Sequence, residues 1–296
     1  MSFLEAILLG VVQGVTEFLP VSSSGHIAVL NNLLHTNNET GLLFEIMLHI
    51  GTMAAVIFTF RSDIKRMFWE ALRIISDLVY NLKAWMHNKV HETDDRLYKK
   101  ILHNNYRKLI VMILVSSIPT GIMGFLLRGI VQQMNLSLLA CGSGMLITAV
   151  ILIVVDYWNY GDKIPKDIKV KEALLIGTCQ GIGVLPGISR LGITVTAGLL
   201  CGFRRSFAVK YSYLLSIPAI LGAMLLEIRE FHVPSMNFHL GAAYTLGMLA
   251  AALSGFLCIR FLMSLINKKK FKYFAIYCGC IGIISLVCNF ILPLQQ

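Results

Sequence analysis

Residues 5–14 read Glu-Ala-Ile-Leu-Leu-Gly-Val-Val-Gln-Gly, and residues 172–181 read Glu-Ala-Leu-Leu-Ile-Gly-Thr-Cys-Gln-Gly. The two segments align without a gap, and each is followed within a few residues by Leu-Pro and then by a serine-containing loop. This repetition predicts two copies of one unit, in which position 172 of the second copy corresponds to position 5 of the first. We place the two units at residues 1–158 and 159–296.

The composition is that of a membrane protein. Of the 296 residues, 56% are hydrophobic and only 14% are charged, and the mean hydropathy is +0.71. Soluble domains have about a quarter of charged residues and fewer apolar ones. These values exclude a disordered chain, a coiled coil, a disulfide scaffold and an ordinary soluble enzyme, and they indicate an all-α integral membrane protein.

Six apolar runs are long enough, or nearly so, to cross a bilayer as helices, which takes about 20 residues. The expected transmembrane helices lie at about 42–60, 109–127, 136–155, 211–228, 239–263 and 273–292. Two further apolar regions, 1–34 and 172–203, are interrupted by Gly, Pro and Ser. Each half is too short to span, so we interpret both as re-entrant helix–loop–helix pairs, because irregular backbone at membrane depth must be buried or line a cavity.

Each unit therefore contains one re-entrant pair and three spans, and an odd number of spans inserts the second copy upside down. Such inverted repeats place broken helices face to face near the membrane midplane, with half-helix N-termini directed at an anion. We expect the loops at 20–26 and 186–194 to meet and form one site. The alternative, two merely kinked spans, leaves the repeated motif unexplained.

Most positively charged residues lie in loops that would face the same side of the membrane. Loops at 61–108, 157–172, 203–210 and 260–272 hold 23 of the 26 Lys and Arg residues. If these loops face the cytoplasm, both chain termini face outward. The net charge of +10 then gives no reason to expect nucleic acid as a partner. The first part of loop 61–108 reads equally well as an amphipathic helix on the inner membrane surface and as a solvated connector.

A carboxylate and an amide lie on one helical face before the first loop. Gln13 and Glu17 are four positions apart in the chain, which places them one turn apart on a helix. A carboxylate within a membrane is costly unless a cation or a metal pairs with it. We therefore name Glu17 and Gln13 as candidate ligands of a divalent cation.

The first loop combines hydroxyls with a glycine and an imidazole. Ser22, Ser23, Ser24 and Gly25 at a helix start offer hydroxyl and backbone N–H groups to an anion. His26 follows, and its side chain is suited to proton transfer near neutral pH. A serine-rich loop is more often a helix cap and a lone histidine more often a satisfied core group, so neither feature decides the matter by itself.

The second loop adds a guanidinium. Arg190 stands alone in an apolar region, and its planar fork suits bidentate contact with phosphate oxygens. Gly187, Ser189 and Thr194 flank it. A purely structural ion pair between Arg190 and Glu17 is the simpler alternative. Carboxylate, hydroxyl, imidazole and guanidinium in two duplicated loops together favour phosphoryl transfer.

These stretches resemble a known family. Residues 13–26, Gln-Gly-Val-Thr-Glu-Phe-Leu-Pro-Val-Ser-Ser-Ser-Gly-His, and 186–194, Pro-Gly-Ile-Ser-Arg-Leu-Gly-Ile-Thr, are similar to the two signature motifs of bacterial undecaprenyl-diphosphate phosphatases, the bacitracin-resistance protein family. Residues 214–219 and 274–277 also resemble family segments. The likeness covers nearly the whole chain. It differs at Gln13, where the family often has Glu, and at Leu191, where Ser is common.

The resemblance implies a multi-pass enzyme of the bacterial inner membrane with its active site toward the outer face. It implies hydrolysis of a polyprenyl diphosphate lipid, undecaprenyl diphosphate, to the monophosphate carrier used in cell-wall synthesis, with Mg²⁺ or Ca²⁺ as cofactor. Carried over, Glu17, Ser23, His26 and Arg190 are catalytic, and Ser22, Ser24, Gly25, Gly187, Ser189 and Thr194 bind substrate.

Our mechanistic hypothesis gives Ser23 the in-line attack and His26 the proton exchange, while the alternative makes His26 or a water molecule the nucleophile. An inverted repeat is also a transporter design, so a carrier of polyprenyl phosphate is the second hypothesis. The surrounding membrane lipids are the other expected partners. The sequence leaves the oligomeric state open, with a homodimer as one option.

Overall fold

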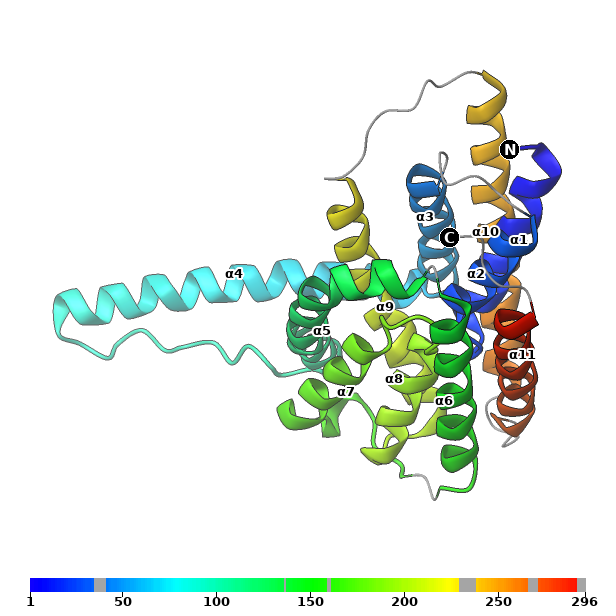
Figure 1. Ribbon diagram of the computed structural model, residues 1–296. Helices are drawn as coiled ribbons and strands as arrows, with labels where there is room; N and C mark the ends of the chain where they lie inside the picture. The colour runs from blue at the N-terminus through cyan, green and yellow to red at the C-terminus, as the bar shows by residue number, and fades with distance from the viewer. Residues whose placement is uncertain (35–40, 136, 159–160, 229–237, 266–270, 292–296) are drawn as a thin grey trace.

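The computed structural model describes residues 1–34, 41–135, 137–158, 161–228, 238–265 and 271–291, and all regular elements there are helical (Figure 1). In chain order the α-helices are α1 (Phe3–Phe18), α2 (Ser23–Leu34), α3 (Gly41–Thr59), α4 (Arg61–His91), α5 (Asn105–Asn135), α6 (Leu138–Asp156), α7 (Val170–Ile182), α8 (Arg190–Leu200), α9 (Arg205–Ile228), α10 (Phe238–Leu265) and α11 (Phe271–Ile291). A 3₁₀ turn, η2 (Pro165–Asp167), precedes α7.

Six of these helices are long and apolar enough to cross a membrane: α3, α5, α6, α9, α10 and α11. They coincide with the six expected spans, so that prediction is confirmed, and the chain is a multi-pass membrane protein. Two of the expected span ends, residues 136 and 292, lie outside the described residues.

Two pairs of short helices occupy the interrupted apolar regions. The first pair, α1 and α2, has 16 and 12 residues, and the second, α7 and α8, has 13 and 11. At 1.5 Å per residue none of the four reaches across about 30 Å of hydrocarbon. The helix–loop–helix form is thus as expected, while its re-entrant placement in a bilayer and the division into two units stay predictions.

The short helices pack across the boundary between the two expected units. Helix α1 packs mainly on α10 of the second unit, and α7 mainly on α5 of the first. Glycines permit both contacts, because a Cβ at Gly10 would lie 2.3 Å from the Gly247 carbonyl oxygen, and one at Gly177 would lie 2.0 Å from that of Ser116. Gly10 and Gly177 are the same position of the repeat, so the duplicated glycine marks a duplicated close helix contact.

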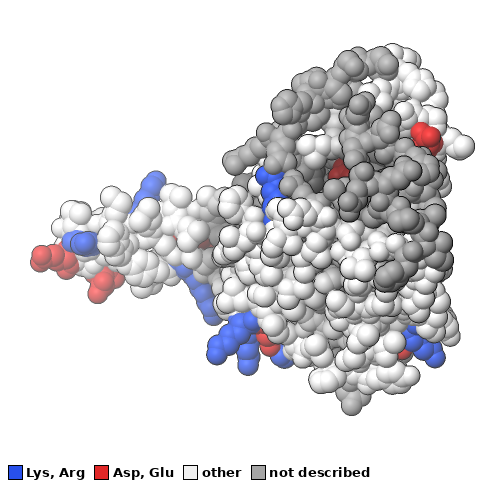
Figure 2. Space-filling model, viewed as in Figure 1, with Lys and Arg blue, Asp and Glu red and all other residues white. Residues whose placement is uncertain are grey.

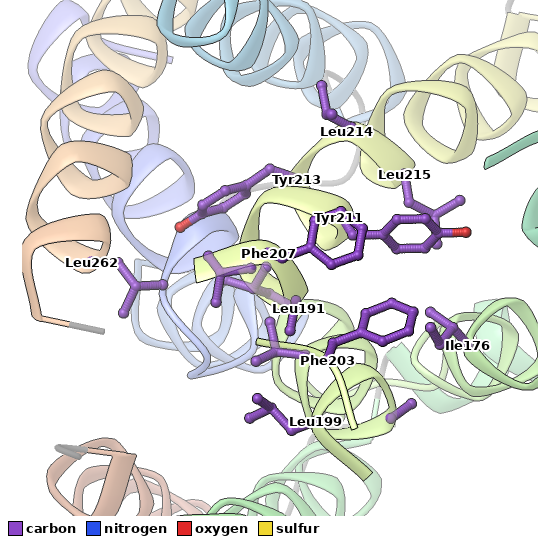
Figure 3. Packing of buried hydrophobic residues seen from close by; sticks show 14 of the residues in the cluster. Ile176, Leu191, Leu199, Phe203, Phe207, Tyr211, Tyr213, Leu214, Leu215 and Leu262 are labelled. Atoms are coloured by element: carbon purple, nitrogen blue, oxygen red, sulfur yellow. The ribbon is translucent and has the colours of Figure 1, made fainter. Parts of the chain in front are cut away.

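An aromatic and aliphatic core holds α8 and α9 against the end of α1. Phe203, Phe207, Tyr211 and Tyr213 are buried together there (Figure 3). The Tyr213 hydroxyl donates a hydrogen bond of 2.8 Å to the carbonyl oxygen of Phe18, the last residue of α1. This contact fixes the C-terminal end of α1 beside α9, at the place where the expected site lies.

Helix α4 projects from the helical body (Figure 1). Of the two alternatives for the first part of loop 61–108, the structure shows a helix, although its position on a membrane surface stays a prediction. Arg107 at the start of α5 ties this helix to α4, because its guanidinium donates to Glu70 at 2.7 Å and to Asp77 at 2.6 Å, and it also donates to the Ile101 carbonyl oxygen of the intervening segment at 3.1 Å. Hydrogen bonds from Arg107, the largest contribution, and from Asn104 and Arg73 lower the pKa of Glu70 from 4.5 to about 2.

Charged side chains are absent from most of the body in the view of Figure 2, whereas Lys and Arg side chains gather along α4 and at the lower edge of the body. This distribution agrees with an apolar belt and a basic side, as the sequence predicts. One of the cations that the sequence places on the opposite side, Arg229, lies outside the described residues.

Candidate active site

The two loops meet, as the repeat predicts. The backbone N–H of Gly187 donates to the Ser24 hydroxyl at 3.3 Å, across a separation of 163 residues in the chain. Gly187 has a φ of +79°, and a Cβ there would lie 2.0 Å from the carbonyl oxygen of Cys141. Glycine is required at this turn both by its conformation and by the close approach of α6.

The two turns cap their helices with equivalent serine hydrogen bonds, although Ser22 has a left-handed backbone with a φ of +70° and Ser189 an extended one with a φ of −74°. Ser22 accepts from the Gly25 N–H at 3.3 Å, and Ser189 accepts from the Gly192 N–H at 3.0 Å. Both serines cap the N-terminus of the following helix, α2 or α8, which is a frequent role of serine. They occupy the same position of the repeat, because Ser22 lies as far from Glu5 as Ser189 lies from Glu172. Two helix N-termini, each with partial positive charge, are thereby directed toward the meeting point.

Glu17 is held from both units. Ser23, the first residue of α2, donates its hydroxyl to Glu17 Oε2 at 2.7 Å. Arg190, the first residue of α8, pairs through Nη2 with Glu17 Oε1. Gln13 Nε2 also donates to Oε2, at 3.3 Å. Equivalent positions of the two units thus bind the two oxygens of one carboxylate. The Glu17 side chain is only 4% exposed and that of Arg190 is 22% exposed, so the guanidinium remains accessible.

His26 is fixed at both ring nitrogens. Nδ1 lies 2.7 Å from the carbonyl oxygen of Ser22, and Nε2 lies 2.7 Å from the Tyr277 hydroxyl of α11. A carbonyl oxygen only accepts hydrogen bonds, so in the neutral ring Nδ1 carries the hydrogen and Nε2 accepts from Tyr277. The sequence analysis predicted that His26 exchanges the proton of Ser23. In the structure, Ser23 instead bonds to Glu17 and His26 bonds to Tyr277.

The remaining candidate residues lie at the same junction. Thr194 donates its hydroxyl to the Arg190 carbonyl oxygen at 2.9 Å, within α8. The Ser189 N–H donates to the hydroxyl of Thr148 of α6 at 2.9 Å. The hydroxyls of Ser22 and Ser24 lie 3.3 Å apart. Every residue named from the two loops therefore lies at the junction.

Three residues at this junction were not among the sequence candidates: Thr148, Tyr277 and His49. His49 of α3 interacts electrostatically with both Glu17 and Arg190, and its Nδ1 has no hydrogen-bond partner within the described structure. The available signal was a polar side chain inside an apolar span. Tyr277 also lies in one of the segments that resemble the family, although no role was attached to it.

A divalent cation has one protein carboxylate to bind here. In the described part of the chain, no group of three or more His, Cys, Asp or Glu residues could hold a metal ion. Mg²⁺ is commonly bound by one or two carboxylates together with substrate phosphates, and it retains several waters. Glu17 and the amide oxygen of Gln13, whose nitrogen faces Glu17, fit such a shared site and would not suffice for a cage made of protein alone.

The sequence has known relatives. The sequence pattern of the family described as "Bacitracin resistance protein BacA" matches residues 6–284. The chain is 38% identical over 294 residues to an undecaprenyl-diphosphatase of Methanosphaera stadtmanae, covering 99% of this chain and 100% of the relative. It is 37% identical over 288 residues to an undecaprenyl-diphosphatase of Alkaliphilus metalliredigens, covering 97% and 98%.

The chain belongs to the bacitracin resistance protein BacA family. The match extends from α1 into α11 and therefore includes both loops, Glu17, Arg190 and the His26–Tyr277 pair. The family resemblance expected from the two motifs is confirmed.

Proposed function

We propose that this protein hydrolyses undecaprenyl diphosphate to undecaprenyl phosphate and inorganic phosphate. The main support for the proposal is that Ser23 and Arg190, the first residues of α2 and α8, both bind the carboxylate of Glu17. A hydroxyl beside a carboxylate is a nucleophile with its base, and a guanidinium beside two helix N-termini is a phosphate site. The names of the relatives support this reaction over transport of a polyprenyl phosphate.

Binding of the terminal phosphate is assigned to the two helix starts. Arg190 bonds the phosphate oxygens through guanidinium N–H groups that Glu17 does not use. The N–H groups at the starts of α2 and α8, with the hydroxyls of Ser22 and Ser24, supply further donors. The Gly187 turn brings the two starts together, and Ser189 and Thr194 hold Arg190 in place. The isoprenyl tail needs only apolar surface between the spans.

The chemical step uses Ser23 and Glu17. Ser23 Oγ forms a bond to the terminal phosphorus, its proton passes to Glu17, and the bond from phosphorus to the bridging oxygen breaks, releasing undecaprenyl phosphate. A water molecule then forms the new P–O bond, the Ser23–phosphorus bond breaks, and the proton on Glu17 returns to Ser23. His26 accepts the proton of the attacking water at Nε2, where this bond replaces the one from the Tyr277 hydroxyl, and passes it to bulk water as the phosphate leaves.

Mg²⁺ or Ca²⁺ would be held by Glu17 and Gln13 together with the diphosphate, and would offset the negative charge of the substrate. We place the protein in the bacterial inner (plasma) membrane with the site toward the outer face, because the sequence assigns the basic loops to the cytoplasm. A homodimer is compatible with this proposal and is not required by it.

The test is phosphate release from C55 isoprenyl diphosphate by the purified full-length protein in detergent, with and without a chelator. Release that stops with chelator and resumes with Mg²⁺ or Ca²⁺ supports the enzyme and its cofactor. Phosphate release that continues unchanged in the presence of chelator would contradict the proposed requirement for a divalent cation. Tight binding of the lipid without any release would instead identify a carrier.

The identity of the nucleophile has its own test. Rapid acid quenching during turnover should trap acid-stable phosphoserine at Ser23, detectable by mass spectrometry. Phosphohistidine at His26 is acid-labile and needs an alkaline quench. Inversion of configuration at an isotopically chiral terminal phosphate, with no phosphorylated residue under either quench, would show direct attack by water and assign Ser23 a binding role.

A further inference from the structure

A small cavity lies beside the pair of Glu17 and Arg190. Its volume is about 10 Å³, and it is formed by helices α1, α7, α8 and α9. The residues around it are Glu17, Phe18, Gln180, Arg190, Leu191, Thr194, Ser212, Tyr213 and Ser216. That volume accommodates about one water molecule.

The hydroxyl groups around the cavity have already used their hydrogens. Ser212 donates to the Ala208 carbonyl oxygen at 2.9 Å, and Ser216 donates to that of Tyr213 at 2.8 Å. Thr194 likewise donates to the Arg190 carbonyl oxygen. Each hydroxyl donates along its own helix, so it can offer only lone pairs to the cavity.

Gln180 adds an acceptor that nothing in the described structure satisfies. Its Nε2 donates to the Thr120 hydroxyl at 3.4 Å, but its Oε1 is buried without a hydrogen-bond partner. The residue as a whole is 1% exposed. Buried polar atoms almost always have a partner, in protein or in ordered water. The unpaired oxygen beside an acceptor-lined cavity therefore calls for a ligand that donates hydrogen bonds.

We propose that this cavity binds a single water molecule, held by Gln180 and donating toward the Glu17 side of the active site. Water fits better than a cation because Arg190 also lines the cavity and already neutralises Glu17. A buried cation would then lack a counter-charge. One water can donate to Gln180 Oε1 and to a second oxygen, while it accepts from Arg190.

The consequence concerns the proposed phosphatase reaction, on which this inference rests. Gln180 occupies the same position of the repeat as Gln13, since each directly precedes the second glycine of the repeated motif. Gln13 contacts Glu17 directly, whereas Gln180 reaches the Glu17–Arg190 pair through the water. Gln180 is therefore a positioning residue for the guanidinium and the carboxylate, and it touches neither substrate nor metal.

The experiment compares three variants of the full-length protein: Gln180→Met, which keeps the side-chain length but removes the acceptor, Ser216→Ala, and the two together. We expect Gln180→Met to lower kcat about tenfold with KM within about twofold, because small displacements of a positioned group slow the chemical step. The double variant should be no slower than Gln180→Met, because both changes remove the same water. Thr178→Ala, an exposed hydroxyl on the same helix, is the matched control.

A high-resolution structure of the unaltered protein supplies a readout that does not depend on activity. One density peak within hydrogen-bond distance of Gln180 Oε1 is expected, and it should be lost in Gln180→Met. An empty cavity would overturn the water site, and so would additive effects of the two changes on kcat. A melting temperature that is higher in Na⁺ than in choline at equal ionic strength would show that the cavity binds a cation instead. A protein that releases no phosphate but shows the peak would refute the proposed function and leave the site standing.

Discussion

The turn that ends at Ser22 and the turn that ends at Ser189 have the same cap hydrogen bond, but the side chains that follow them have different chemical properties. Each ends in a serine that caps a helix, and each is followed three residues later by a glycine whose N–H meets that cap. The first residue of the helix differs: it is Ser23 in one unit and Arg190 in the other. One contributes a hydroxyl and the other a charge, and both bind Glu17.

The comparison also explains why two units make one site. The position of the second unit that corresponds to Glu17 is Val184, which follows Gln180 as Glu17 follows Gln13. Only the first unit has a carboxylate at this position, so the second unit cannot reproduce the nucleophile and its base. The duplicated backbone builds two helix starts with partial positive charge, and single-copy side chains turn their junction into one candidate active site.

The largest effect is expected at Arg190. Arg190→Ala should lower kcat/KM about 10⁴-fold, within the range found for arginines that stabilise a transferring phosphoryl group. Arg190→Lys should remain far below the native rate, because a lysine cannot present the planar fork. Phosphate release measured under identical detergent conditions tests both, with the melting temperature as the control for folding. Near-native phosphate release by Arg190→Ala would show that the ion pair between Arg190 and Glu17 has only a structural role.

The next largest difference in rate is expected between the Ser23 and Ser189 variants. Ser23→Ala should reduce kcat by about 10³-fold, because the proposed nucleophile is lost. Ser189→Ala should cost about 1 kcal/mol of stability, as the loss of a helix cap does, and about tenfold or less in rate. Steady-state kinetics and thermal unfolding of both variants measure this contrast. Equal losses of rate would contradict the division of roles between the turns.

A smaller loss is expected at Tyr277. Tyr277→Phe keeps the ring beside His26 but removes the hydroxyl that bonds Nε2, and we expect kcat to fall about tenfold with KM nearly unchanged. Tyr273→Phe, one turn earlier on α11 and exposed, is the matched control. In a His26→Ala background the Tyr277→Phe change should have no further effect. An undiminished effect there would mean that Tyr277 acts independently of His26.

The sequence predicted the framework of the molecule because its signals are local. Six spans follow from the lengths of apolar runs, and the meeting of the two loops follows from the repeated Gln-Gly and Leu-Pro positions. The glycines of α1 and α7 recur because the same close helix contact is built twice. Such features need only neighbouring residues to be recognised.

Partner choice within the site was harder to predict. His26 and Ser23 are near in sequence, which suggested a catalytic pair, but the helical turn directs His26 toward α11, 251 residues away in the chain. Gln180 lines the cavity beside the site and Thr148 bonds to Ser189, each from a helix whose sequence is mostly apolar. No local pattern specifies these contacts, because they depend on which helices cross at one depth.

A second arginine provides the smallest expected effect on activity and the sharpest contrast with Arg190. Arg107 is 3% exposed and binds Glu70 and Asp77 outside the site. Hydrogen bonds to Glu70, of which that from Arg107 contributes most, lower its pKa from 4.5 to about 2, so the stability that the Glu70 carboxylate contributes is fully present above pH 4.5 and is lost as the pH falls toward 2. Arg107→Ala should keep phosphate release within about twofold, since it lies far from the chemistry.

The segment 92–104 should report this loss directly. In the native protein its hydrogen exchange, corrected for the intrinsic effect of pH, should accelerate as the pH drops from 4.5 toward 2, because protonated Glu70 no longer pairs with Arg107. In Arg107→Ala the segment should exchange fast at every pH. An acid response that survives in the variant would assign the anchoring to other contacts, such as those of Asn81 and Asn88 with the same segment.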